Sequence, residues 1–198
     1  MSEITAQAVA QLREMTGAGM MDAKKALVEA NGDLTEAAEV LRKSGVIKAL
    51  SKAERATNEG CVHAYIHSNA KSGAMVEVLC ETDFVARNEA FVELCHDLAL
   101  HICASAPICV SRDQVSTELV EKEKEMYRAE LAGQGKPAEM MEKIIEGKLN
   151  KYFSEIVLLE QMFVKDDTKT IDQLVKEKIT TLGENIQVRR FSRFVLGA

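Results

Sequence analysis

Three side chains that bind metal ions in many proteins stand close together in the segment CVHAYIHS: Cys61, His63 and His67. Alternate side chains of a β-strand share a face, so all three would lie on one face, and Cys61 and His63 can reach a common zinc ion. His67 lies about 13 Å beyond His63 along such a strand, a gap that zinc bonds of about 2.0–2.3 Å cannot close. We therefore favour an ordinary half-exposed strand face and predict no metal site.

The chain carries no linear signature of a nucleotide-binding or catalytic site. A GxxxxGK[ST] phosphate loop is absent, and GQGKP (133–137) has the wrong spacing for one. The segment GAGMMDAKK contains G-x-G, but Asp22 stands where the third glycine of a dinucleotide fingerprint belongs. A nucleophile elbow and an HExxH motif are also absent. Catalytic groups can converge from distant segments, yet these absences favour a protein that is not an enzyme and uses no cofactor.

The composition and charge of the chain also bear on its partners and its cellular compartment. The chain has 198 residues and a net charge of −6, whereas sequence-independent nucleic-acid binding depends on basic surface. No apolar run reaches the length of about 18 residues that a membrane span needs. The five cysteines are odd in number and form no CxxC motif, which favours a reducing compartment. The first residues resemble no targeting leader. We expect a cytoplasmic protein that binds neither nucleic acid nor membrane directly.

Three helical stretches, separated by TGAG and NGD, open the chain. Asp33 and Glu36 have the spacing of a capping box at the start of the third, and Gly45 is placed to end it. Short amphipathic helices are stable only when their apolar faces pack together. We therefore predict a three-helix bundle in residues 1–50 and a charged linker at 51–59.

The apolar pattern then changes from a helical to an alternating period. CVHAYIHS and AMVEVLCE flank NAKSG and predict a β-hairpin, which the later segment NIQVRRFSRFVL can join as a third strand. Helices are predicted at about 84–105, 116–132 and 137–163 and in TIDQLVKEKIT. The second and third of these form an antiparallel helical hairpin over 116–163. Together these elements predict an α+β core in residues 60–198.

Several side chains have two interpretations. Met20 and Met21 are adjacent and about 100° apart on a helix, so one of them is pushed outward, where flexible Met side chains are common at binding surfaces; alternatively, both pack at the edge of the bundle.

Phe84 lies in the first turn of a helix in ETDFVARN. Taken alone, it is better explained as a core residue than as an outward-pointing ring. His101 has the setting of a buried, hydrogen-bonded histidine, and LGEN (182–185) that of a helix end with a glycine cap.

Three long segments, ITAQAVAQLREMTGAGMMDAKKALVEANGDLTEAAEVLRKSG, CETDFVARNEAF and EGKLNKYFSEIVLLEQMFVKDDTKTIDQLV, resemble the elongation factor Ts family in sequence and in order. The resemblance spans nearly the whole chain. It implies a guanine-nucleotide exchange factor for elongation factor Tu, the GTPase that carries aminoacyl-tRNA to the ribosome. It also implies that the N-terminal bundle is similar to a ubiquitin-associated domain and that a helical hairpin protrudes from the α+β core.

The resemblance also implies which residues contact the GTPase. In the family, an Asp-Phe pair lies outside the core, and its Phe wedges between helices of the GTPase and disturbs the magnesium and phosphate site. The residues that match the family's contacts are Asp83, Phe84, His101, Leu182, Gly183, Arg13, Met20, Met21 and Lys24. The first five belong to the core, and the last four belong to the docking surface of the bundle.

The core is short compared with family members that carry two related subdomains. Short members resemble one another in being able to pair, which implies a homodimer and a complex of two factors with two GTPases. Two other functions compete with exchange: a module that binds ubiquitin-like proteins, suggested by the bundle alone, and a small thiol or metal enzyme. The first leaves residues 60–198 unexplained. Metal analysis and thiol reactivity would test the second.

Overall fold

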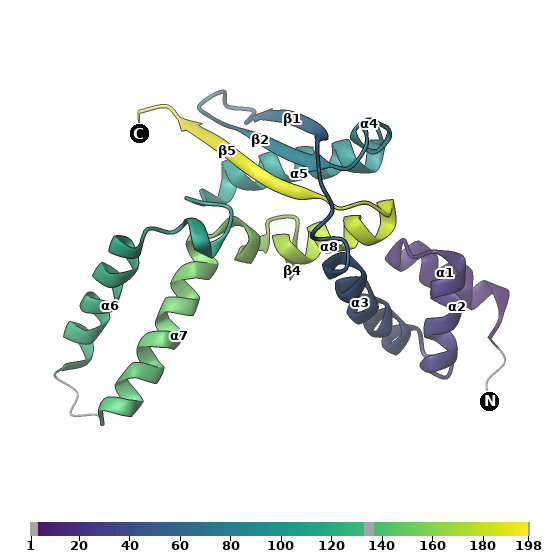
Figure 1. The fold of residues 1–198 in the computed structure, drawn as a ribbon, viewed down its shortest axis with the longest axis horizontal. Coiled ribbons are helices and arrows are strands. Elements are labelled where there is room, and N and C mark those ends of the chain that lie inside the picture. The colour runs from purple at the N-terminus through teal and green to yellow at the C-terminus, as the bar shows by residue number, and fades with distance from the viewer. Residues whose placement is uncertain (1–3, 133–136, 198) are drawn as a thin grey trace. The chain divides into compact units, whose positions relative to one another are not determined.

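Three helices open the chain and a small sheet follows them in the computed structural model, which describes residues 4–132 and 137–197 (Figure 1). The α-helices are α1 (Ala6–Thr16), α2 (Met20–Glu29), α3 (Leu34–Leu50), α4 (Asp83–Ala86), α5 (Glu89–Ser105), α6 (Thr117–Ala132), α7 (Ala138–Ile156) and α8 (Ile171–Leu182). The strands are β1 (Glu59–Ile66), β2 (Ser72–Cys80), β3 (Met162–Phe163), β4 (Asp166–Thr170) and β5 (Gln187–Val195).

The larger sheet has the strand order β1-β2-β5. The hairpin predicted from the alternating segments is therefore confirmed, and so is the prediction that the C-terminal strand joins it. Strands β3 and β4 pair with each other in a separate antiparallel sheet. The chain combines helices with small sheets of antiparallel strands, which confirms the α+β class.

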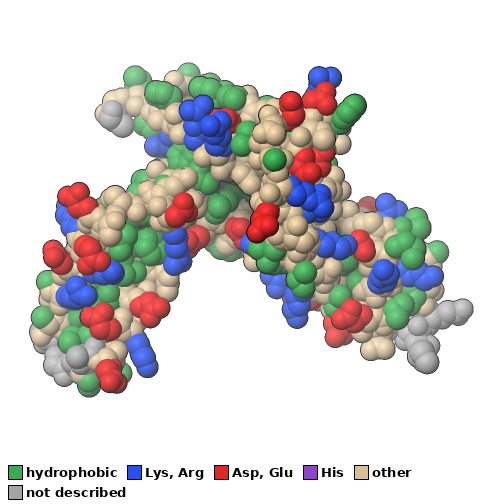
Figure 2. Space-filling view, viewed as in Figure 1, with side chains coloured by type: hydrophobic (Ala, Val, Ile, Leu, Met, Phe, Trp, Pro, Cys, Tyr) green, Lys and Arg blue, Asp and Glu red, His purple; other side chains and the backbone are tan. Residues whose placement is uncertain are grey.

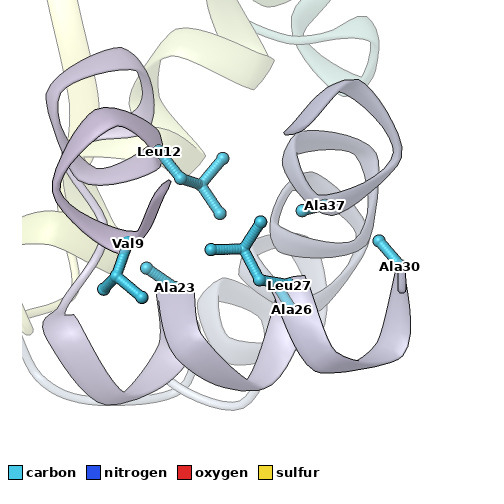
Figure 3. Packing of buried hydrophobic residues seen from close by; sticks show 7 residues of the cluster. All are labelled: Val9, Leu12, Ala23, Ala26, Leu27, Ala30 and Ala37. Carbon is cyan, nitrogen blue, oxygen red and sulfur yellow. The ribbon is translucent and has the colours of Figure 1, made fainter. Parts of the chain in front are cut away.

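The first three helices share an apolar core built mainly from alanine and leucine (Figure 3). Leu12 of α1 and Leu27 of α2 are fully buried and lie in its centre, and small alanine side chains let the helices approach closely. Two of the helices begin at side-chain caps: Thr5 accepts a hydrogen bond from the Ala8 N–H at 3.1 Å, and Asp33 accepts one from the Glu36 N–H at 2.8 Å. The predicted bundle and the predicted Asp33 cap are confirmed.

The prediction that Gly45 ends the third helix is wrong, because α3 continues to Leu50. The glycine instead permits a close approach by α8. A Cβ at this position would lie 3.2 Å from the hydroxyl oxygen of Thr180, and that hydroxyl donates a hydrogen bond to the Gly45 carbonyl at 3.2 Å. A glycine inside a helix can thus mark a packing contact rather than a helix end.

The single helix predicted at 84–105 is two helices, α4 and α5. Asn88 separates them, since its side-chain oxygen accepts a hydrogen bond from the Ala90 N–H at 2.9 Å and so begins a new helix. This break leaves Asp83 and Phe84 on a short helix of their own directly after β2.

The helix predicted at 137–163 ends earlier, at Ile156. Backbone pairing with the segment that follows α5 replaces the next helical hydrogen bonds: the Ile108 N–H donates to the Ile156 carbonyl at 2.9 Å, and the Leu158 N–H donates to the Cys109 carbonyl at 2.9 Å. Helices α6 and α7 nevertheless lie side by side as predicted (Figure 1), around the buried side chains of Leu131, Ile145 and Leu149. The residues GQGK of the segment GQGKP lie outside the described residues.

The chain forms two compact units. The first contains the N-terminal segment through Val62, Val78–Cys95 and Gln173–Gln187, and the second contains His63–Glu77, His96–Asp172 and the residues from Val188 onward. The predicted division at residues 50 and 59 stays a prediction. Among the described residues, no helix combines the length and the hydrophobicity that crossing a bilayer requires.

Candidate functional site

The turn that follows β2 presents an aromatic ring to solvent. The side chain of Phe84 is 82% exposed, which confirms the outward orientation and overturns the interpretation of this residue as part of the core. Asp83 forms an ion pair at 3.2 Å with Arg87, the residue that follows this short helix. Isolated exposed apolar side chains are common on protein surfaces, so exposure alone does not define a site. The way in which the chain holds this turn is more informative.

A carboxylate from a distant segment holds the turn. Oε2 of Glu184 accepts hydrogen bonds from the backbone N–H groups of Glu81 at 3.1 Å and Thr82 at 3.0 Å, and Oε1 accepts one from the Thr82 hydroxyl at 2.6 Å. The same hydroxyl accepts a hydrogen bond from the Val85 N–H at 3.4 Å and so caps α4. Hydrogen bonds to a charged group are among the stronger ones in proteins. The backbone immediately before Phe84 is therefore fixed in one conformation.

Further contacts fix both sides of this turn. The Asn185 N–H donates to Oε1 of Glu81 at 2.6 Å, while the Asn185 side chain is buried and donates to the carbonyls of Ala53 at 3.2 Å and Arg55 at 2.9 Å. The Cys80 thiol donates to the Thr82 carbonyl at 3.2 Å. Burial, together with the nearby Glu184 charge, raises the pKa of Cys80 to about 11, so the thiol stays protonated at neutral pH and serves as a donor.

Leu182 and Gly183 directly precede Glu184 in the chain. Helix α8 ends at Leu182, and Gly183 has a φ of +81°, a left-handed conformation that suits glycine at a helix end. Its N–H donates to the Ile179 carbonyl at 3.0 Å. Gly183 is exposed and Leu182 is half-buried. Because Glu184 bonds to Thr82, the two segments ETDF and LGEN form one surface.

The sequence indicated Asp83, Phe84, Leu182 and Gly183 only through a family resemblance, and it did not indicate Glu184 or Asn185. The sole local signal for Glu184 was its place after a predicted helix end. Its partner Thr82 lies 102 positions away in the chain, which no local pattern can reveal.

The bundle offers a second exposed surface within the same unit. Met20 and Met21 are 61% and 65% exposed, so both side chains are mostly open to solvent. A shallow groove of about 330 Å³ lies beside them, lined by Met21, Lys24, Lys25, Val28 and Glu29. Figure 2 shows hydrophobic side chains next to basic ones on the visible surface of the bundle. Arg13 is exposed, and its Nε donates to the Ala18 carbonyl at 3.2 Å in the loop before α2.

His101 differs from the other candidate contact residues, because its side chain is fully buried. Nε2 lies 3.0 Å from Oε1 of Gln161, and Nδ1 accepts a hydrogen bond from the Val164 N–H at 3.2 Å. Burial lowers the pKa of His101, in agreement with a neutral ring that donates from Nε2. The bonds of His101 in the free chain are those of a core residue, and its predicted contact with the GTPase stays a prediction.

The three potential metal ligands of CVHAYIHS do not converge. Cys61 and His63 are half-buried on one face of β1, as predicted, but His67 follows the strand and its Nδ1 lies 3.1 Å from the Tyr65 hydroxyl. Over residues 4–132 and 137–197, no three His, Cys, Asp or Glu side chains are grouped so that they could hold a metal ion. Burial lowers the pKa of His63, and the neighbouring His96 lowers it further.

Comparison with known proteins covers nearly the full chain. The family model described as Elongation factor TS matches residues 2–198. The chain belongs to the elongation factor Ts family. It is 55% identical to elongation factor Ts of Geobacter sulfurreducens over 98% of this chain and 90% of that protein. It is 54% identical to elongation factor Ts of Solibacter usitatus over 100% of this chain and 93% of that protein. It is 53% identical to elongation factor Ts of Oleidesulfovibrio alaskensis over 100% of both chains.

Membership in the elongation factor Ts family places the chain in translation elongation and guanine-nucleotide exchange. The match extends far beyond the bundle, so a module that binds ubiquitin-like proteins explains too little of the chain. The Oleidesulfovibrio relative has matching length, which shows that the short core also occurs in another elongation factor Ts.

Proposed function

We propose that the chain accelerates GDP release from elongation factor Tu by inserting Phe84 between helices of the GTPase. The observation that carries this proposal is the combination of an 82% exposed ring with a backbone held by the hydrogen bonds that it donates to Glu184. A ring on a preformed turn binds without the entropy cost of ordering that turn. Asp83, Leu182 and Gly183 supply neighbouring contacts on the same surface.

The mechanism requires no contact between the factor and the nucleotide. Such GTPases hold GDP through Mg²⁺ and through the backbone N–H groups of a phosphate loop. A factor that binds better to the distorted form of this site favours that form and weakens nucleotide binding. The coupling is reciprocal, so bound nucleotide weakens binding of the factor by the same ratio.

Burial of the Phe84 ring alone gives an estimate of the coupling between the factor and the nucleotide. Full burial of a Phe side chain is worth about 1.5–3 kcal/mol, and each 1.4 kcal/mol or so corresponds to about a tenfold change in an equilibrium constant. Phe84 can thus supply about one to two decades of coupling. Any larger coupling requires Asp83, the Leu182–Gly183 contact and the bundle as well.

The bundle serves as the docking surface in this proposal. Replacing both Met20 and Met21 by alanine is expected to weaken complex formation by about tenfold or more, because each buried Met side chain is worth about 1.5–3 kcal/mol. Nucleotide release at saturating factor is expected to stay close to the wild-type rate, since docking is separate from the wedge. Binding and release measured on the same double variant test this prediction.

A matched control is Met126→Ala, because Met126 is 53% exposed on α6, outside the proposed docking surface. It should leave both quantities unchanged. A Met20→Ala/Met21→Ala variant that binds normally and yet releases nucleotide slowly would show that these residues act on the nucleotide site instead.

The chain is further proposed to form a homodimer that binds two GTPase molecules. The open face of the sheet supports this, because Ile66, Met75 and Phe194 from its three strands are all exposed. We expect light scattering at tens of micromolar to give a dimer mass, and Phe194→Asp to give a monomer by placing a charge in the interface. A monomer mass for the wild type, with a 1:1 complex, would contradict the prediction.

Capture from cytosol tests the proposed partner. Immobilised chain should retain a GTPase from the lysate, identified as elongation factor Tu by mass, and excess GDP should release it because nucleotide and factor oppose each other. Retention that is insensitive to GDP would contradict exchange while leaving binding intact. Absence of elongation factor Tu from the captured proteins would overturn the proposed function.

A further inference from the structure

Two imidazole rings outside the proposed exchange site face each other within the second unit. His63 lies on β1 and His96 lies on α5. Nε2 of His63 is 3.3 Å from Nδ1 of His96, and the rings are nearly perpendicular, with centroids 5.4 Å apart. Both side chains are half-buried and thus partly accessible to solvent. Neither residue has a part in the proposed exchange mechanism.

The separation of the two nitrogen atoms fits a shared metal ion. Two imidazole ligands of a tetrahedral Zn²⁺, each about 2.0–2.1 Å from the metal, have nitrogen atoms about 3.3–3.4 Å apart. The distance in the structure, 3.3 Å, falls within this span. We propose that His63 and His96 form a binding site for a divalent transition-metal ion such as Zn²⁺, with Nε2 of His63 and Nδ1 of His96 as its protein ligands.

Both nitrogen atoms can bind one metal ion after a change of tautomer. At present one ring donates a hydrogen bond to the other, so one lone pair is already directed between the rings. The donor ring must carry its proton on its other nitrogen, which is a change of tautomer with no change in its charge. The Tyr65 and His96 rings form a T-shaped pair, with centroids 5.6 Å apart at 81°, and this contact helps to keep the His96 ring in place.

The proposed site is open rather than closed. In the part of the chain that the structure describes, no third His, Cys, Asp or Glu joins the pair, so water must complete the coordination. Neutral imidazole suits Zn²⁺, Cu²⁺ and Ni²⁺ and does not suit Mg²⁺ or Ca²⁺. The sequence suggested Cys61 as the partner of His63, whereas the structure pairs His63 with His96, 33 positions away. A bound ion would link β1 to α5.

Titration of the full-length protein with Zn²⁺ tests the proposal. We expect binding that His63→Gln and His96→Gln each weaken by about tenfold or more, since either change removes one of two protein ligands. His67→Gln is the matched control from the same segment, and Cys61→Ser controls for binding by thiols. Neither control is expected to change the affinity. Circular dichroism shows whether each variant remains folded.

Ring ¹⁵N spectra of the wild-type protein provide a readout that does not depend on any variant. Zn²⁺ should shift the signals of Nε2 in His63 and Nδ1 in His96 and leave those of His67 and His101 in place. The proposal is overturned if Zn²⁺ up to about 1 mM leaves both signals unchanged. This result would mean a binding free energy of less than about 4 kcal/mol. It is also overturned if Cys61→Ser or His67→Gln abolishes binding as fully as the two ligand variants do.

Discussion

Phe84→Ala is expected to slow factor-stimulated GDP release by about tenfold or more at saturating factor, because the variant lacks the ring that favours the distorted nucleotide site. Folding stability is expected to change little. The ring is 82% exposed in the free protein, so its removal neither opens a cavity nor uncovers core surface. Fluorescent-GDP release and thermal unfolding of this one variant measure both expectations.

A second phenylalanine in the same segment supplies the matched comparison. Phe91 is fully buried in α5, and Phe91→Ala should lose about 3–5 kcal/mol of folding free energy, as buried aromatic residues do. If Phe84→Ala lowered the melting temperature as much as Phe91→Ala, Phe84 would be a core residue and the proposed wedge would be wrong.

Glu184→Gln is expected to slow GDP release even though it leaves Phe84 in place. The carboxylate accepts hydrogen bonds from two N–H groups and one hydroxyl, whereas a Gln side chain offers one oxygen and turns an NH₂ group toward a donor. Fixing the backbone of a residue costs about 1–2 kcal/mol, so a loosened turn should weaken the action of the factor by about five- to thirtyfold. Release rates at saturating factor measure the effect.

Two comparisons separate positioning from a general loss of structure. Glu118→Gln removes an exposed carboxylate on α6, which is not part of the turn, and should have no effect on release. In a Phe84→Ala background, Glu184→Gln should slow GDP release little further, because the ring that Glu184 positions is already absent. Fully additive effects in this double-mutant cycle would show that Glu184 acts independently of the ring.

Local patterns predicted the elements better than their ends. The three apolar stripes of the bundle and the alternation in CVHAYIHS and AMVEVLCE depend on periods of 3.6 and 2 residues, which the backbone imposes. One missed feature, the break between α4 and α5, depends on the local hydrogen bond between Asn88 and Ala90, and two others depend on contacts between distant segments. Thr180 packs against Gly45 inside α3, and α7 ends early because Ile156 and the residues after it pair with residues 108–110.

In the candidate site, too, local sequence patterns did not reveal contacts between distant segments. Physical reasoning on ETDFVARN alone favoured a buried Phe84, and only the family resemblance indicated an exposed one. Glu184 holds the turn from 102 positions away, and His63 finds its partner 33 positions away on a different element. His101 is the converse case, because its setting between apolar residues indicated burial correctly, while the contact inferred from resemblance stays a prediction.

The central claim is that Phe84 supplies coupling between the factor and the nucleotide, and paired affinity measurements test it most directly. The affinities of wild type and Phe84→Ala are measured for elongation factor Tu without nucleotide and with GDP, and the ratio of the two affinities is the coupling. We predict that Phe84→Ala reduces this ratio by about one to two decades, mainly through weaker binding to the nucleotide-free GTPase. An unchanged ratio, with both affinities lowered equally, would contradict the account and make Phe84 an ordinary contact.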